Sequence, residues 1–204
     1  MTIIFSMRIF KNLILTLCLF SFNVQGQTTQ YKALLDTAIN FTGQLFVSVK
    51  PLTNIRITEN DIRDNFDDFA ELLKDIDSVK LYQIIKNSKQ PDTLYWTDIE
   101  LDRSLLVQDR EQDVQVEYAL NKFNLTEKKQ IRSYKRQINQ FNSLNPSDKN
   151  VYYYSRPVFD DSKHFAVVQW DNGHSFLGGG GGIRLYKLKG DTWKVVGVLA
   201  RWQY

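Results

Sequence analysis

Residues 182–202 read GIRLYKLKGDTWKVVGVLARW, and this stretch decides the fold. It contains two segments rich in aromatic and β-branched residues, which strands prefer. Between the two segments lie Gly190 and Asp191. A Gly-Asp pair in this position is typical of a two-residue hairpin turn. The stretch therefore predicts two antiparallel strands joined by a tight turn.

Two upstream segments have the same composition, VYYYSRPVF at 151–159 and HFAVVQW at 164–170. The residues DDSK at 160–163 lie between these two segments and suit another hairpin turn. Together with the C-terminal hairpin, these segments predict an antiparallel meander of about four strands. The meander is expected over about residues 150–204.

The chain before the meander has the apolar spacing of helices. A first helix is predicted from Gln30 to Val49, closed by Pro51. A second, TENDIRDNFDDFAELLKDID at 58–77, opens with a pattern much like a capping box. Further helices are expected over Val79–Ile85 and after Thr126. Helices over about 27–145 followed by strands define an α+β fold, which we expect to form one globular domain.

The segment LYWTDIELDRSLLVQDREQDVQVEYALNKF, residues 94–123, fits two structures. Thr97 could cap a short helix, because a threonine side chain can accept a hydrogen bond from a backbone N–H in the first turn. In contrast, Val114 and Val116 alternate with polar residues as they would in a strand. The sequence does not decide between these structures.

The first 26 residues have the layout of a secretory signal peptide. Two basic residues precede an apolar run of ten, Leu13–Phe22, and the small residues Val24 and Gly26 precede a cleavage site before Gln27. The run is shorter than the roughly 20 residues of a membrane span. We therefore expect an exported protein, periplasmic or secreted, with a mature domain from residue 27 to 204 and no transmembrane segment after cleavage.

Cysteine and charge narrow the classes of function further. Cys18 is the only cysteine and lies in the predicted signal peptide, and Leu17 before it does not fit a lipidation motif. The mature chain would then have neither a disulfide nor a thiol nucleophile. The chain has 26 Lys and Arg against 23 Asp and Glu, and the signal peptide removes two of the basic residues. A nearly neutral mature domain gives no argument for a nucleic-acid partner.

The C-terminal segments also resemble a group of proteins. SRPVFDDSKHFAVVQW (155–170), a glycine run, IRLYKLKGDTWKVV (183–196) and a terminal Trp together resemble uncharacterised exported proteins of Bacteroidota. The likeness covers about the last 55 residues and, more weakly, LYWTDIEL at 94–101. These motifs are structural, so the resemblance implies an envelope location and this architecture, and it identifies no active-site residue.

The glycine run Gly178–Gly182 lies between the predicted strands and follows His174 and Ser175. The letters GHSFLG depart from the nucleophile elbow G-x-S-x-G, because the second glycine comes one position late and no helix can follow directly. Successive glycine N–H groups could instead bind an anion, with Arg184 nearby. The favoured alternative is a mobile connection over residues 171–182, in which Gly-to-Ala changes would be tolerated.

Two charged helix faces and two histidines are further candidate sites. An acidic face could offer oxygens to calcium or a carboxylate pair to glycoside hydrolysis, but a regular helix favours a solvated face for Asp64, Asp67, Asp68 and Glu71. A basic face could meet anionic polymers or lipid headgroups, or simply be solvated, at Lys128, Lys129, Arg132, Lys135 and Arg136. The two histidines, His164 and His174, are too few for a structural zinc site, so we predict no metal or cofactor.

The leading hypothesis is a non-catalytic module that binds a ligand or partner in the bacterial envelope, such as an envelope protein or an anionic polymer. Aromatic side chains suit such recognition. Tyr186 could take part or belong to the core. The first alternative is a hydrolase acting on an envelope polymer or peptide through Asp171, His174 or Ser175 of the 171–182 loop. The second is a structural or assembly protein without a ligand site. The candidate binding residues are Trp170, Asp171, His174, Ser175, Phe176 and Arg184.

Cleavage of the leader gives the first testable prediction. Because Val24 and Gly26 occupy the small-residue positions before Gln27, the mature protein should begin at residue 27. The intact mass of the protein recovered from a native envelope fraction measures this directly. A membrane-bound product that keeps residues 1–26 would contradict export with cleavage.

Overall fold

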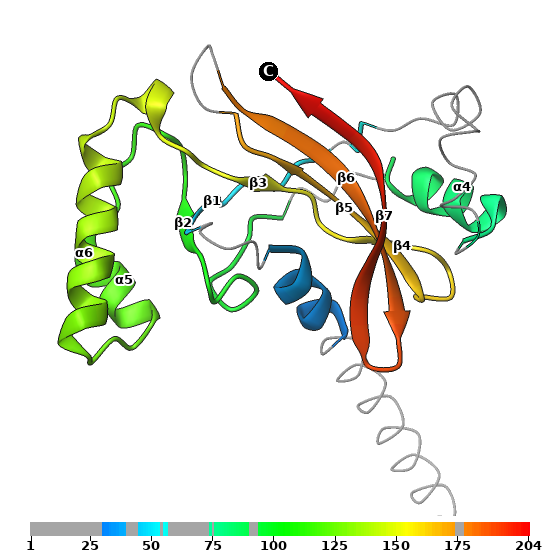
Figure 1. Cartoon of the computed structure of the whole chain (residues 1–204), viewed down its shortest axis with the longest axis horizontal. Coiled ribbons are helices and arrows are strands. Elements are labelled where there is room, and N and C mark those ends of the chain that lie inside the picture. Colours follow the sequence, from blue (N-terminus) through cyan, green and yellow to red (C-terminus); the bar gives the residue numbers. More distant parts are fainter. Residues whose placement is uncertain are drawn as a thin grey trace, which may run out of the picture.

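A computed structural model shows an α+β protein, with helices mainly in the N-terminal part and an antiparallel sheet formed by the C-terminal third (Figure 1). The predicted fold class is therefore confirmed. The predicted signal peptide, most of the second predicted helix and residues 174–177 lie outside the residues that the structure describes. The described residues are 30–39, 45–53, 55–56, 74, 76–89, 94–173 and 178–204.

The sheet has the strand order β3-β5-β6-β7, and β4 also pairs with β5. All of its pairings are antiparallel. The segment 151–159, expected as one strand, forms two short ones because Arg156 and Pro157 interrupt the pairing, and proline has no N–H to donate. The strands are β3 (Tyr153–Tyr154), β4 (Val158–Phe159), β5 (Phe165–Asp171), β6 (Gly180–Lys189) and β7 (Thr192–Gln203).

The predicted hairpin turn between β6 and β7 is confirmed. Lys189 pairs with Thr192, which leaves Gly190 and Asp191 as a two-residue loop. Gly190 has a φ of 61°, a left-handed conformation that glycine adopts without a steric penalty. A positive φ at the first loop position matches a type II′ turn, whose twist suits the two flanking strands.

The sheet is covered on both faces, and β5 shows this most clearly. Phe165 and Val167 pack into one buried cluster with the helix α4 (Ser78–Asn87). Ala166 and Val168 alternate with them and pack into a second cluster with the helical residues 30–39. Because successive side chains of a strand point to opposite faces, an almost continuously apolar strand requires a cover on each face.

A third cluster lies in a helical pair beside the sheet (Figure 1). Ile138 and Phe141 are buried there, and the Phe141 ring stacks on Phe46 with 4.0 Å between ring centroids. A bridge between Val47 and Tyr152 links this region to the start of the sheet segment. The elements of this region are β1 (Phe46–Ser48), β2 (Leu105–Val107), α5 (Val116–Lys122), α6 (Lys128–Ser143) and the 3₁₀ turn η2 (Pro146–Asp148).

The predicted helix from Gln30 to Val49 is wrong at its C-terminal end. Residues 30–39 are helical, but Phe46–Ser48 form β1, which pairs in parallel with β2. Val47 is fully buried between its neighbours. The apolar residues of this segment therefore serve strand pairing, since burial against a distant segment outweighs local helical periodicity.

The ambiguous segment 94–123 contains elements of both kinds, at places the sequence pattern did not indicate. Thr97 does act as a cap: its hydroxyl accepts from the Glu100 N–H at 3.3 Å, and the Glu100 carboxylate accepts from the Thr97 N–H at 3.0 Å. The residues that follow form turns rather than a helix. Val116, which alternated like a strand residue, is the first residue of α5.

The glycine run belongs largely to the sheet, so the expected twelve-residue mobile connection is wrong. Gly180, Gly181 and Gly182 are the first three residues of β6 and pair with β7. A Cβ on Gly181 would lie 2.4 Å from the indole of Trp202, and one on Gly182 would lie 2.8 Å from the Ala200 carbonyl oxygen. These positions require glycine because neighbouring groups occupy the space of a side chain.

We predict that Gly182→Ala destabilises the protein by about 1–3 kcal/mol, because the added methyl group meets a backbone oxygen that cannot rotate away. Its melting temperature should fall by several degrees. The matched control is Gly173→Ala, whose Cβ would have its nearest contact at 3.5 Å, an ordinary van der Waals distance. Equal melting temperatures for the two variants would contradict the close approach at Gly182.

Candidate functional site

The structure separates two of the predicted binding residues. Trp170 and Asp171 are neighbours on β5, so their side chains point to opposite faces of the sheet. Trp170 shares its face with Arg184, whose guanidinium lies 5.5 Å from the centre of the Trp170 ring. His174, Ser175 and Phe176 lie outside the described residues.

Asp171 is buried at the end of β5, where its carboxylate binds the side chain of the C-terminal residue, Tyr204. The Tyr204 hydroxyl donates to Asp171 Oδ2 at 2.9 Å, and an Arg56 nitrogen lies 3.6 Å from the same oxygen. Arg56 also donates to the Tyr204 hydroxyl at 3.0 Å and stands 5.1 Å from the centre of the Trp202 ring. Asp171 thus joins Arg56 and the C-terminal residue Tyr204 to the end of β5. Tyr186, for which the sequence allows either a surface or a core position, is buried.

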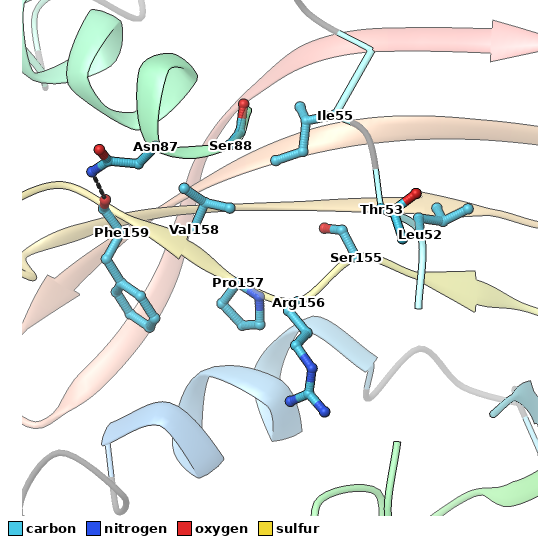
Figure 2. Close-up of a pocket in the computed structure, with 10 residues that line it drawn as sticks. All are labelled: Leu52, Thr53, Ile55, Asn87, Ser88, Ser155, Arg156, Pro157, Val158 and Phe159. Atoms are coloured by element: carbon cyan, nitrogen blue, oxygen red, sulfur yellow. Dashed lines mark hydrogen bonds between the residues drawn. The ribbon is translucent and has the colours of Figure 1, made fainter. Parts of the chain in front are cut away.

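The structure has a pocket of about 310 Å³ on the side of the sheet that carries β4 and α4 (Figure 2). Its walls come from three segments: residues 52–55, the C-terminal end of α4, and the chain from Ser155 to β4. A bridge between Leu52 and Ser155 holds the first and third segments together. The lining residues are Leu52, Thr53, Ile55, Asn87, Ser88, Ser155, Arg156, Pro157, Val158 and Phe159.

Hydrogen bonds to the protein fix the polar side chains of the pocket. Ser155 Oγ accepts from the Gln169 N–H at 2.9 Å, and Ser88 Oγ donates to the Ile85 carbonyl at 2.7 Å. Asn87 Nδ2 donates to the Phe159 carbonyl at 3.2 Å (Figure 2). A hydroxyl has one donor and two acceptor lone pairs, so these groups keep further hydrogen-bonding capacity for a ligand.

Among the described residues that line the pocket, Arg156 is the one that carries a charge, and its guanidinium points away from the other polar side chains (Figure 2). It binds Glu100 Oε1 at 2.5 Å and donates to the Tyr31 hydroxyl at 2.9 Å. It also lies 4.4 Å from the centre of the Trp96 ring. The charge of Arg156 is therefore used to bind the helical residues 30–39 and the turn at Glu100 to the sheet.

The ion pair changes the acidity of Glu100. Burial by itself raises the pKa of Glu100, but hydrogen bonds from Arg156 and Thr97, with the attraction of the guanidinium, hold the pKa below its usual value of 4.5. Sequence reasoning missed this pair. An arginine between two strand segments was visible, but its partner lies 56 residues away and nothing in the spacing identifies it.

A second polar group lies on α5, where Tyr118 and Lys122 are one turn apart and both contact Asp98. The Tyr118 hydroxyl donates to Asp98 Oδ1 at 2.5 Å, and the Lys122 ammonium pairs with the same oxygen. Burial and the bond to Asp98 raise the pKa of Tyr118 well above its usual range, and burial lowers the pKa of Lys122. A phenol with a raised pKa stays protonated near neutral pH, so this group serves as a structural contact between α5 and the turn at Asp98.

Within the described part of the chain, no group of three or more His, Cys, Asp or Glu side chains is placed to hold a metal ion. None of the described helices is both long enough and apolar enough to cross a bilayer. Comparisons with protein-family models, curated proteins and solved structures gave no match. The assignment of a site therefore depends on the geometry of this chain.

The Glu100–Arg156 pair makes a testable contribution to stability. Because the folded pKa of Glu100 is below its unfolded value, the contribution is present above about pH 4.5 and is lost as pH falls through the folded pKa. Glu100→Gln should lower the free energy of unfolding at pH 7 by about 1–3 kcal/mol, and the difference from wild type should shrink in acid. Urea unfolding of both proteins at pH 7 and at a pH below 4.5 measures this difference in the free energy of unfolding. The control is the exposed Glu111→Gln, and a Glu100→Gln deficit that persists unchanged in acid would contradict the role of the pair.

Proposed function

We propose that this protein is an exported, non-catalytic binding module of the bacterial envelope that holds a small, uncharged ligand in the pocket of Figure 2. The observation that carries the proposal is the chemistry of the lining. Neutral hydrogen-bonding side chains alternate there with the apolar groups of Ile55 and Val158. Ligand sites are typically apolar cavities with a few placed polar groups.

The lining favours an uncharged ligand. The single charged residue of the described lining, Arg156, is already paired with Glu100 and directed away from the other polar side chains. A charged ligand would lose water on entering the pocket and meet no counter-charge there, and this desolvation is unfavourable. The volume of about 310 Å³ is at the small end of the range for ligand pockets. A small polar molecule, or one unit of a neutral polymer, fits both limits.

The position of Asp171 supports binding over hydrolysis. This residue was a candidate for chemistry in the 171–182 loop, but its carboxylate lies in β5 and accepts from Tyr204. The hydrolase alternative would need the remaining loop candidates, His174 and Ser175. The envelope location rests on the N-terminal leader and on the resemblance to exported Bacteroidota proteins.

Ligand-dependent thermal stabilisation tests the proposal, with neutral sugars and small amides compared against sugar phosphates. A ligand at 100 times its Kd stabilises the folded state by about 2.7 kcal/mol, which raises Tm by roughly 5–11 °C for a chain of this size. Thr53 is exposed at the pocket rim, so Thr53→Phe should fill the entrance without disturbing the core. The matched control is the exposed Thr126→Phe, which lies outside the pocket.

A neutral compound should stabilise wild type and Thr126→Phe and have little effect on Thr53→Phe. Equal stabilisation of all three proteins would place the ligand elsewhere and contradict the pocket. Stabilisation by the sugar phosphates alone would contradict the neutral chemistry of the site. Turnover of the bound compound would contradict a non-catalytic role and support the hydrolase alternative.

A further inference from the structure

The helix α6 carries a basic face that no described acidic residue neutralises. Five cations occupy one continuous arc of the helix surface outside the arc of its buried residues Ile138 and Phe141, and all five are exposed. None of them forms an ion pair with another residue in the described part of the chain, and α6 itself contains no Asp or Glu. We call this set the basic face: Lys128, Lys129, Arg132, Lys135 and Arg136.

The spacing of the basic face opposes the stability of its own helix. Arg132 has a like charge at each of its four neighbouring helical positions, three and four residues away on either side. Like charges at these spacings repel one another across one turn. Two of the cations also occupy the first turn, where the N-cap residue Glu127 supplies a single negative charge, although the N-terminal end of a helix favours negative charge. An external anionic surface would remove both conflicts.

We propose that the basic face docks the protein peripherally onto an anionic lipid surface. The five cations follow one side of a helix over about two turns, and such a row can meet a plane of headgroups without a groove. The helix stands beside the sheet, at the end of the molecule away from α4 and β4 (Figure 1). This placement leaves the pocket of Figure 2 at the other end.

Two observations favour lipid over nucleic acid as the anionic partner. The aromatic residue within this stretch, Tyr134, is half-buried and packs against Phe123 with 5.1 Å between ring centroids, so its ring is engaged within the protein rather than presented for bases to stack on. The chain as a whole has nearly equal numbers of acidic and basic residues, unlike a typical nucleic-acid-binding protein. The apolar side chains of α6 are buried or half-buried against the rest of the protein rather than exposed for insertion, so the attachment is electrostatic.

Vesicle co-sedimentation with the full chain tests this proposal. Vesicles of phosphatidylcholine alone are compared with vesicles of phosphatidylcholine and phosphatidylglycerol in equal parts. The test variant neutralises three cations of the basic face, Lys128→Gln, Arg132→Gln and Lys135→Gln. The control neutralises three exposed cations elsewhere, Lys86→Gln, Lys194→Gln and Arg201→Gln. The apolar N-terminal run is the same in all three proteins, so differences between them report on the changed charges.

We expect wild type and control to bind the anionic vesicles more tightly than the neutral ones. The basic-face variant should lose roughly 100-fold of that preference, at about a fivefold loss for each cation. Raising the salt from about 0.1 M to about 1 M, which shortens the screening length from about 10 Å to about 3 Å, should abolish the preference of wild type. A melting curve confirms that the variant is folded, and relief of the repulsion should leave its Tm equal to or above that of wild type.

Three outcomes would overturn the proposal. The first is equal binding of wild type to both vesicle types. The second is an equal loss of the preference for anionic vesicles in the control variant, which would show that only the net charge of the protein matters. The third is tight, salt-sensitive binding to duplex DNA without binding to the anionic vesicles, which would assign the basic face to a different polyanion.

Discussion

Burial of β5 on both faces is the constraint on which the rest of this structure depends. Phe165 and Val167 need an apolar cover on one side, and Ala166 and Val168 need one on the other. A C-terminal meander alone provides the strands but not the two covers. The helical residues 30–39 and α4 provide them, which explains why the sheet needs helices from two separate parts of the chain.

Charged groups in the sheet region mainly connect distant segments. Arg156 binds Tyr31 and Glu100 to the chain before β4, and Asp171 binds Arg56 and Tyr204 to the end of β5. Asp171, Arg156 and Glu100 are largely removed from water, so each needs a partner to offset its desolvation, whereas Arg56 and Tyr204 are more than half exposed. The pocket borders the first of these connections, and Arg156 is the charged residue among its described lining residues.

The two surfaces proposed for function differ in chemistry and in location. The pocket lies at β4 and α4, and it offers hydroxyl and amide groups on a rigid frame. The basic face lies on α6, beyond the third cluster, and offers only charge. Separation of this kind would let a membrane attachment and a ligand site operate without competing for the same residues.

Local pattern was sufficient wherever a segment's structure depends on its own neighbours. Gly190 and Asp191 specified a hairpin turn, and the apolar spacing after Thr126 specified α6, because turn geometry and helical periodicity are short-range properties. The local pattern predicts the wrong structure for Phe46–Ser48. These residues have a helical spacing but form a strand because they pair with residues almost 60 positions later.

The candidate site shows the same division between features that a local pattern predicts and features that depend on distant contacts. The sequence by itself determined that the last third is a sheet, that Trp170 and Arg184 belong to it, and that α6 is basic on one side. Only the tertiary structure decided that Asp171 is a buried anchor and that Gly182 must be glycine, because a backbone oxygen from β7 occupies its side-chain space. It also decided where the pocket lies. The physical reason is that packing and ion pairing join residues far apart in the chain, and no local pattern encodes which distant groups will meet.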